Sequence, residues 1–224
     1  MSEYFTNIVK YSGYIILAIN TFLYFKSNRK NSIAFKILSY YLLLCLFIQL
    51  YTSYLSSLKT NNLYLSHYYF IGQFILLSLF FSKILTGKRL ISIIKKILFL
   101  VVILLIGYYS LYPKDYLKWN VFEITITSVP LLIYSFIFFT QKIEIKTSNY
   151  FIYFNSGFFI YLLSSTLLFT LGNIGIGNIE IKPIKLFVWK VNSILYLIYQ
   201  ILVFVEWNKN FRQKTFRCKT SINT

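Results

Sequence analysis

Four polar side chains that could do chemistry occur inside otherwise apolar segments of the chain: His67, Glu123, Lys190 and Asn192. A charged side chain inside a bilayer costs roughly 3 kcal/mol unless it finds a partner or reaches the membrane surface. These residue types therefore predict a polar cluster in which Lys190 pairs with Glu123 and His67 is hydrogen-bonded nearby. The alternative is that Lys190 and Lys10 extend their charged ends to the surface, where Glu123 is simply hydrated.

A second polar stripe follows Lys190 along the same apolar segment, 186–207. Beyond Asn192 its members are Ser193, Tyr196, Tyr199 and Gln200. The stripe either relays a change along the segment or forms hydrogen bonds between neighbouring helices, and the second role is the commoner one. In segment 147–179 the face made by Gly157, Tyr161, Ser164 and Ser165 predicts a close approach of another helix.

The sequence gives little support for a catalytic site, a metal site or a disulfide framework. Of the six acidic residues only Glu123 falls well inside an apolar segment, so no segment holds the acidic pair that an intramembrane aspartyl protease requires. Cys45, Cys218 and the single histidine are too few for a disulfide framework or a metal site. A serine–histidine pair using His67 stays open, without a G-x-S-x-G motif. We expect no enzymatic activity, no metal and no cofactor.

The composition indicates that these residues lie in a membrane. Of 224 residues, 57% are hydrophobic, 21% aromatic and 13% charged, and the mean hydropathy is +0.62. Soluble domains of this size are about 25% charged. The chain has too few polar residues to cover a soluble globule, so we expect an integral membrane protein.

Seven apolar runs approach or exceed the length needed to cross a bilayer. They cover residues 4–25, 37–58, 60–82, 97–113, 119–140, 147–179 and 186–207. We therefore expect an all-α, polytopic membrane protein with one seven-helix bundle over residues 1–207 and a basic tail over 208–224. Segment 87–96 is either an amphipathic helix on the inner membrane surface or the start of the fourth helix. The glycine-rich stretch 172–178 is expected to be an outer turn.

The basic residues predict the orientation of the helices, because Lys and Arg accumulate in cytoplasmic connections. Most of the 23 fall on one side of the predicted membrane: Lys26, Arg29, Lys30, Lys36, Lys83, Lys88, Arg89, Lys95, Lys96, Lys142, Lys146, Lys209, Arg212, Lys214, Arg217 and Lys219. The N-terminus is therefore predicted outside and the C-terminus inside a bacterial inner membrane.

The net charge of +17 also bears on partners. The basic residues stand in short blocks between apolar runs rather than on one folded basic face, which disfavours nucleic acid as a partner. We expect the cytoplasmic face to contact a signalling partner or anionic lipid. The residues expected to make these contacts are Lys88, Arg89, Lys95, Lys96, Lys209, Arg212 and Lys214.

Three stretches also resemble a known group of proteins. Residues 61–81 (NNLYLSHYYFIGQFILLSLFF), 150–173 and 188–211 are similar to an uncharacterised group of small seven-helix membrane proteins of Bacteroidetes, often encoded beside sensor histidine kinases. The resemblance implies association with a signalling pathway, for example with a histidine kinase. It implies no catalytic or binding residue for this chain.

The leading functional hypothesis is a non-enzymatic membrane sensor or signalling accessory. His67, Glu123, Lys190 and Asn192 would form its input site near the outer surface, and the basic inner face would contact the partner. The alternatives are a small transporter or channel lined by the stripe after Lys190, or a structural subunit of a membrane complex. A homo-oligomer is compatible with each of these hypotheses.

Overall fold

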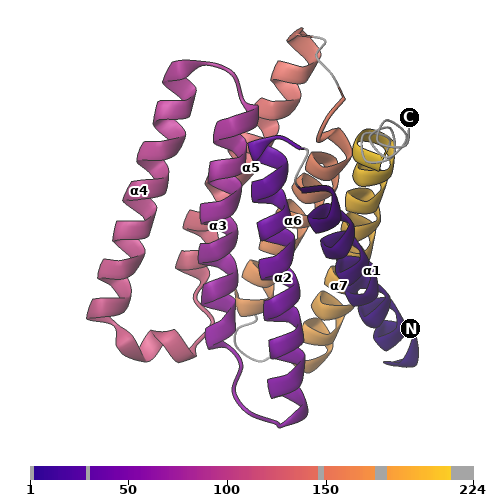
Figure 1. Cartoon of the computed structure of the whole chain (residues 1–224). Helices are drawn as coiled ribbons and strands as arrows, with labels where there is room; N and C mark the ends of the chain where they lie inside the picture. Colours follow the sequence, from indigo (N-terminus) through magenta and orange to yellow (C-terminus); the bar gives the residue numbers. More distant parts are fainter. Residues whose placement is uncertain (1–2, 29–30, 146–148, 175–180, 213–224) are drawn as a thin grey trace. The chain divides into compact units, whose positions relative to one another are not determined.

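A computed structural model describes residues 3–28, 31–145, 149–174 and 181–212, and all regular structure in these ranges is helical (Figure 1). The α-helices are α1 (Glu3–Ser27), α2 (Ile33–Ser57), α3 (Tyr64–Ile84), α4 (Lys88–Leu111), α5 (Val121–Ile145), α6 (Ile152–Ile174) and α7 (Ile181–Glu206). A short 3-10 helix, η2 (Pro113–Leu117), joins α4 to α5, and a π-helical turn, η3 (Trp207–Phe211), follows α7.

Six of these helices are long and apolar enough to cross a membrane. For α6 this comparison covers the apolar span Ile152–Leu168. The predicted all-α fold is confirmed for the described residues, and the six helices indicate an integral membrane protein. The number of membrane crossings and the orientation of the termini are still predictions.

One local prediction is settled by the structure, and a second falls partly outside the described residues. Segment 87–96 belongs to α4, which begins at Lys88 and continues without a break to Leu111, so it is the start of the fourth helix. Gly87 precedes it with a φ of +103°, a backbone conformation that glycine adopts without strain. Stretch 172–178 is helical up to Ile174, and its remaining residues lie outside the described ranges.

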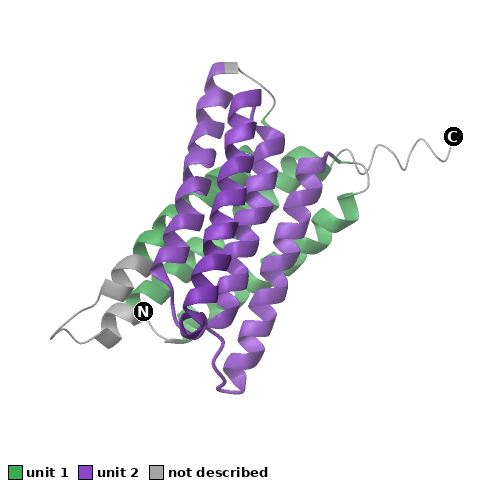
Figure 2. Ribbon diagram, turned by 90° about the vertical axis from the view of Figure 1, so that its left-hand side faces the viewer, with its two compact units in different colours: residues 1–31, 147–224 green, residues 32–146 purple. Residues whose placement is uncertain are grey.

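The chain divides into two compact units, residues 1–31 with 147–224 and residues 32–146 (Figure 2). In the second unit α3 packs against α2, α4 and α5. Because α3 has neighbours on several sides, bulky residues all around it are buried, including Phe74, Leu77 and Phe80. By contrast, α4 exposes a long apolar face that includes Phe99 and Ile103 and suits contact with lipid.

In the first unit α7 packs between α1 and α6. A Cβ added to Gly157 of α6 would lie 3.0 Å from Leu202 Cδ1 and 3.1 Å from Tyr199 Cδ2, both on α7. The ring of Tyr161, one turn further along α6, stacks on Tyr199 at 5.4 Å between centroids. The predicted close approach of another helix to this face of α6 is therefore confirmed.

We expect Gly157→Ala to lower the free energy of unfolding by about 1–3 kcal/mol, because the added methyl group overpacks the contact between α6 and α7. Reversible unfolding in mixed detergent micelles measures this loss. Gly107→Ala in α4 is the matched control, since a Cβ there would meet nothing within 4 Å. The control should be neutral or stabilising by up to about 1 kcal/mol through helix propensity. Equal stability of the two variants would contradict the close packing at Gly157.

Candidate functional site

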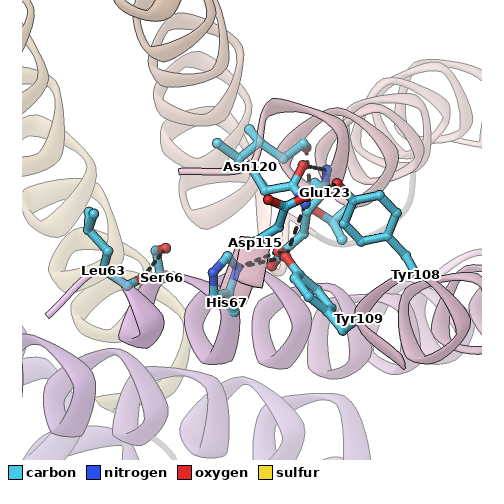
Figure 3. Close-up of polar contacts among 10 residues, drawn as sticks. Leu63, Ser66, His67, Tyr108, Tyr109, Asp115, Asn120 and Glu123 are labelled. Atoms are coloured by element: carbon cyan, nitrogen blue, oxygen red, sulfur yellow. Dashed lines mark hydrogen bonds and ion pairs between the residues drawn. The ribbon is translucent and has the colours of Figure 1, made fainter. Parts of the chain in front are cut away.

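A buried polar cluster lies in the second unit where the first turn of α3, the last turn of α4 and the first turn of α5 meet (Figure 3). Its members are His67 of α3, Tyr109 of α4, Glu123 of α5, and Asn120, which lies just before α5. Asn120 precedes α5, and its Oδ1 accepts a hydrogen bond from the Glu123 backbone N–H at 3.2 Å. This capping contact fixes the start of α5 and with it the position of the Glu123 carboxylate.

Three atoms of the cluster lie within hydrogen-bond distance of one another. Nδ1 of His67 is 2.5 Å from Oε2 of Glu123 and 2.9 Å from the hydroxyl of Tyr109. The same hydroxyl donates a hydrogen bond to Oε2 of Glu123 and accepts one from Nδ2 of Asn120 at 3.2 Å. The hydroxyl of Tyr109 is therefore in contact with all three other side chains, and Oε2 of Glu123 lies within hydrogen-bond distance of this hydroxyl and of Nδ1 of His67.

The two ionisable groups are almost completely enclosed. His67 is 2% exposed and Glu123 is 0% exposed. Nε2 of His67 and Oε1 of Glu123 are also buried, and neither has a hydrogen-bond partner among the residues that the structure describes. A buried polar atom without a partner costs about 1–3 kcal/mol, so the cluster has two polar atoms to which a further donor or acceptor could bind favourably.

Aromatic rings cover the imidazole of His67 on two sides. The ring of Tyr116 stacks on it at 5.1 Å and 26°, and the ring of Tyr109 meets it edge-on at 5.1 Å and 62°. Tyr116 belongs to η2, where burial is the main cause that raises the pKa of its hydroxyl. The cluster is thus closed by the connection between α4 and α5.

The position of η2 is fixed by its own polar contacts. Lys118 donates to one carboxylate oxygen of Asp115 at 3.0 Å, and the hydroxyl of Tyr108 donates to the other at 2.9 Å. The hydrogen bond from Lys118, followed by that from Tyr108, lowers the pKa of Asp115 below its usual range. Asp115 therefore ties η2 to the last turn of α4 wherever its carboxylate is ionised.

Tyr109 also lines a groove between α3 and α4 with a volume of about 340 Å³. Its other lining residues are Ile71, Val102, Leu105, Ile106 and Ser110. The groove is apolar along its length and polar only at the end where Tyr109 and Ser110 lie. Tyr109 consequently separates the buried cluster from a surface that suits the chains of lipids.

The structure brings His67 and Glu123 together, as predicted. Lys190 and Asn192 lie on α7, in the other unit, so the predicted pairing of Lys190 with Glu123 is untested. Sequence reasoning missed Tyr109 and Tyr116, because a chain with 21 tyrosines gives no reason to single out two of them. A signal for Asn120 existed, since Asn immediately before an apolar run is a common helix cap.

The stripe after Lys190 takes part in packing between helices within the first unit. Nδ2 of Asn20 donates to the backbone carbonyl of Gln200 at 2.9 Å and to its Oε1 at 3.2 Å. Tyr196 meets Gly13 of α1, where an added Cβ would lie 3.1 Å from the ring, and Tyr199 stacks on α6 as described above. Ser193 differs, because it donates within α7 itself, to the carbonyl of Trp189 at 2.8 Å. The other contacts favour the interpretation of the stripe as hydrogen bonding and packing between helices.

Glu206 has a role that its position at a helix end did not predict. It is 0% exposed, and its carboxylate accepts hydrogen bonds from the backbone N–H groups of Phe151, Tyr153 and Phe154 at 2.7, 3.0 and 3.3 Å. Nδ2 of Asn210 donates to it as well, at 2.6 Å. A carboxylate at the end of α7 therefore caps the start of α6.

The predicted basic contacts are exposed where the structure describes them. Lys88, Arg89, Lys95 and Lys96 lie on the first half of α4, and Lys209 and Arg212 follow α7. Lys214, together with the rest of the predicted tail and Cys218, lies outside the described residues. The role of these residues toward a partner or lipid is a prediction.

The cluster offers one imidazole and one carboxylate, fewer than the three or four protein ligands of a zinc site. Within the described ranges, no group of three His, Cys, Asp or Glu side chains could hold a metal ion. Comparison with protein-family models, with curated proteins and with solved structures gives no match for this chain. The function of this chain is therefore inferred from the geometry of the cluster.

Proposed function

We propose that the chain is a non-enzymatic seven-helix protein of the bacterial inner membrane that acts as a sensor or signalling accessory. Its N-terminus would be outside and its basic tail inside. The cluster of His67, Tyr109 and Glu123 would be the input site. The observation that supports it is the buried His67–Glu123 contact with its two unpartnered polar atoms.

Structural hydrogen bonding does not require an ionisable pair. Two other buried contacts between side chains of different helices use neutral groups: Tyr41 donates to Gln73 at 3.2 Å, and Asn20 donates to Gln200. The buried carboxylate of Glu206, by contrast, accepts from backbone N–H groups and from Asn210 rather than from an ionisable side chain. Glu123 and His67 can change charge, and ionisable groups within membrane helices usually belong to functional sites. The contrast favours a cluster that responds to its surroundings over one that only holds helices together.

A physical connection from this site to the opposite membrane surface supports the signalling role. Tyr109 lies in the last turn of α4, and Lys88, Arg89, Lys95 and Lys96 lie in its first half. At about 1.5 Å per residue, α4 is long enough to cross the hydrocarbon core of a bilayer. Few residues of α4 are buried, namely Ile94, Val101 and Leu105, so a small shift of the helix would break few packing contacts.

A pull-down from native membranes in mild detergent tests this proposal. We expect a regulatory protein such as a histidine kinase to copurify in fixed stoichiometry. Lys95→Ala combined with Lys96→Ala should recover several-fold less of it, because it removes charges from the inner face. The matched control replaces Lys59 and Lys114, exposed lysines of the predicted outer side, by alanine. Glu123→Gln should keep the partner and the membrane abundance while abolishing the change in the partner's phosphorylation.

Two results would contradict the proposal. Recovery of the chain alone or as a homo-oligomer would favour a transporter or channel, and flux through reconstituted vesicles would then be the deciding measurement. Recovery in a complex without any regulatory protein would favour a structural subunit. An unchanged phosphorylation response of Glu123→Gln, beside a Glu144→Gln control, would remove the input role from the cluster.

A further inference from the structure

We propose that the ligand of the input site is a proton, which binds at Nε2 of His67. This inference rests on the proposed function and names the ligand class of the same site. Three features support it: the enclosure of the site, the hydrogen-bond roles of its atoms, and the place of Tyr116 against the imidazole.

The enclosure of the site excludes larger ligands. His67 is 2% exposed and Glu123 0% exposed, and the rings of Tyr109 and Tyr116 lie against the imidazole. Nε2 itself is buried, so a solute larger than water could touch it only after neighbouring side chains had moved. A proton needs no such opening, since the half-buried Asn120 and Tyr116 beside the cluster bring it within reach of water at the helix ends.

The hydrogen bonds define where the proton binds. Oε2 of Glu123 accepts from the hydroxyl of Tyr109 and lies 2.5 Å from Nδ1 of His67. In the unprotonated state that we propose, Nδ1 is the donor and Glu123 is a carboxylate, which leaves Nε2 of the neutral imidazole with a lone pair that accepts no hydrogen bond. In this state the cluster has a net charge of −1, which is unfavourable inside a membrane.

Proton uptake removes that charge. A hydronium ion gives up one O–H bond, an N–H bond forms at Nε2, and water leaves. The imidazolium and the carboxylate then form a neutral pair, with Nδ1 still donating to Oε2. The carboxylate stabilises the bound proton through the short contact between Nδ1 and Oε2, so proton binding by His67 depends on Glu123.

Among the described residues of the second unit, Glu123 is the charged group that contacts His67. The other titratable groups nearby are neutral, paired or exposed. Tyr109 of α4 and Tyr116 of η2 face the imidazole as neutral phenols. Asp115 of η2 is paired with Lys118, and Lys114 is exposed. The only charged residue of α2 is Lys36, in its first turns, whereas the opposite end of α2 joins the loop to α3.

Tyr116 provides a route from proton binding to a structural response. Its ring is nearly parallel to the imidazole, at 26°, with 5.1 Å between the centroids. A positive charge on His67 is attracted to the face of this ring, whereas a neutral imidazole lacks that attraction. Protonation would therefore strengthen the contact of η2 with α3. Because η2 connects α4 to α5, a change in this contact would act on both helices.

A titration followed by nuclear magnetic resonance tests the inference without a partner protein. His67 is the only histidine, so [13C,15N]-histidine labelling of the full chain in phosphatidylcholine nanodiscs gives one set of imidazole signals. The titration runs from about pH 9 to about pH 4, a range that includes the ordinary pKa of histidine side chains. We expect the Nε2 signal to change once, from unprotonated to protonated, as the pH is lowered. Glu123→Gln should bind the proton at least about tenfold more weakly. Glu144→Gln, an exposed glutamate of α5, should match the wild type.

Two outcomes overturn the inference: an Nε2 signal that is constant over the whole range, or a transition that Glu123→Gln leaves unchanged. Tyr109→Phe is a second variant that keeps the ring, and its lost hydrogen bond to Oε2 should measurably shift the transition. The result is distinguishable from failure of the proposed function. Nε2 can bind a proton in a protein that recruits no regulatory protein. Conversely, a regulatory protein can copurify although Nε2 binds no proton between about pH 4 and about pH 9.

Discussion

Replacing Glu206 by alanine should lower the free energy of unfolding by about 4 kcal/mol. The substitution removes an acceptor for three backbone N–H groups at the start of α6 and for Asn210. Hydrogen bonds to a charged group are stronger than neutral ones, and the N–H groups of Phe151 and Phe154 would lose their acceptor while buried. Reversible unfolding in mixed micelles measures the loss, and faster proteolysis near residues 149–154 would locate it.

Two further variants make this prediction specific. Glu206→Gln keeps the shape and one acceptor oxygen but loses the charge, so it should be intermediate. Glu144→Ala removes an exposed glutamate near the end of α5 and should change stability by no more than about 0.5 kcal/mol. If Glu206→Ala were as stable as Glu144→Ala, the N–H groups of α6 would have other acceptors, and the capping role of Glu206 would be wrong.

The helices could be predicted from the sequence because each one contains a long apolar run. Their ends could not be predicted as well. The apolar run of the fourth helix starts at residue 97, whereas α4 begins at Lys88. Lys and Arg have high helix propensity, so α4 extends beyond its apolar run in the N-terminal direction. It begins directly after Gly87, whose backbone conformation is not helical. Hydrophobicity defines the buried length of a membrane helix, and backbone hydrogen bonding defines its full length.

The candidate site was predictable in part for a similar reason. His67 and Glu123 are conspicuous as ionisable residues in apolar surroundings, and the predicted topology placed them at one depth. Tyr109 is equally important to the geometry, yet it is one of 21 tyrosines. The capping role of Glu206 could not be predicted, because its main partners are backbone N–H groups, which leave no signature in a sequence. Sequence patterns therefore miss residues such as Tyr109 and Glu206, whose roles depend on which groups they contact in the folded structure.

The second large effect concerns the buried pair itself. His67→Leu should lower the free energy of unfolding by about 3 kcal/mol, because the carboxylate of Glu123 would be left buried without the imidazole. Glu123→Leu should cost about 2 kcal/mol, since both nitrogens of His67 would then lack the carboxylate. Unfolding of both variants in mixed micelles, beside the wild type, measures these losses.

The double variant, His67→Leu with Glu123→Leu, should recover most of that loss and approach the stability of the wild type. Replacing both members of a buried ionic pair by apolar side chains removes the cost of burying polar groups along with their attraction. The neutral contact between Tyr41 and Gln73 in the same unit is the matched control, and its coupling should be only about 1 kcal/mol. If the double variant lost the sum of the two single losses, the coupling between His67 and Glu123 would be zero and the two side chains would contribute to stability independently. A stable double variant would instead mean that folding does not require the pair. A protein that folds as well without an ionisable cluster retains it for what the charge can do, and loss of signalling in that variant would then be loss of the input alone.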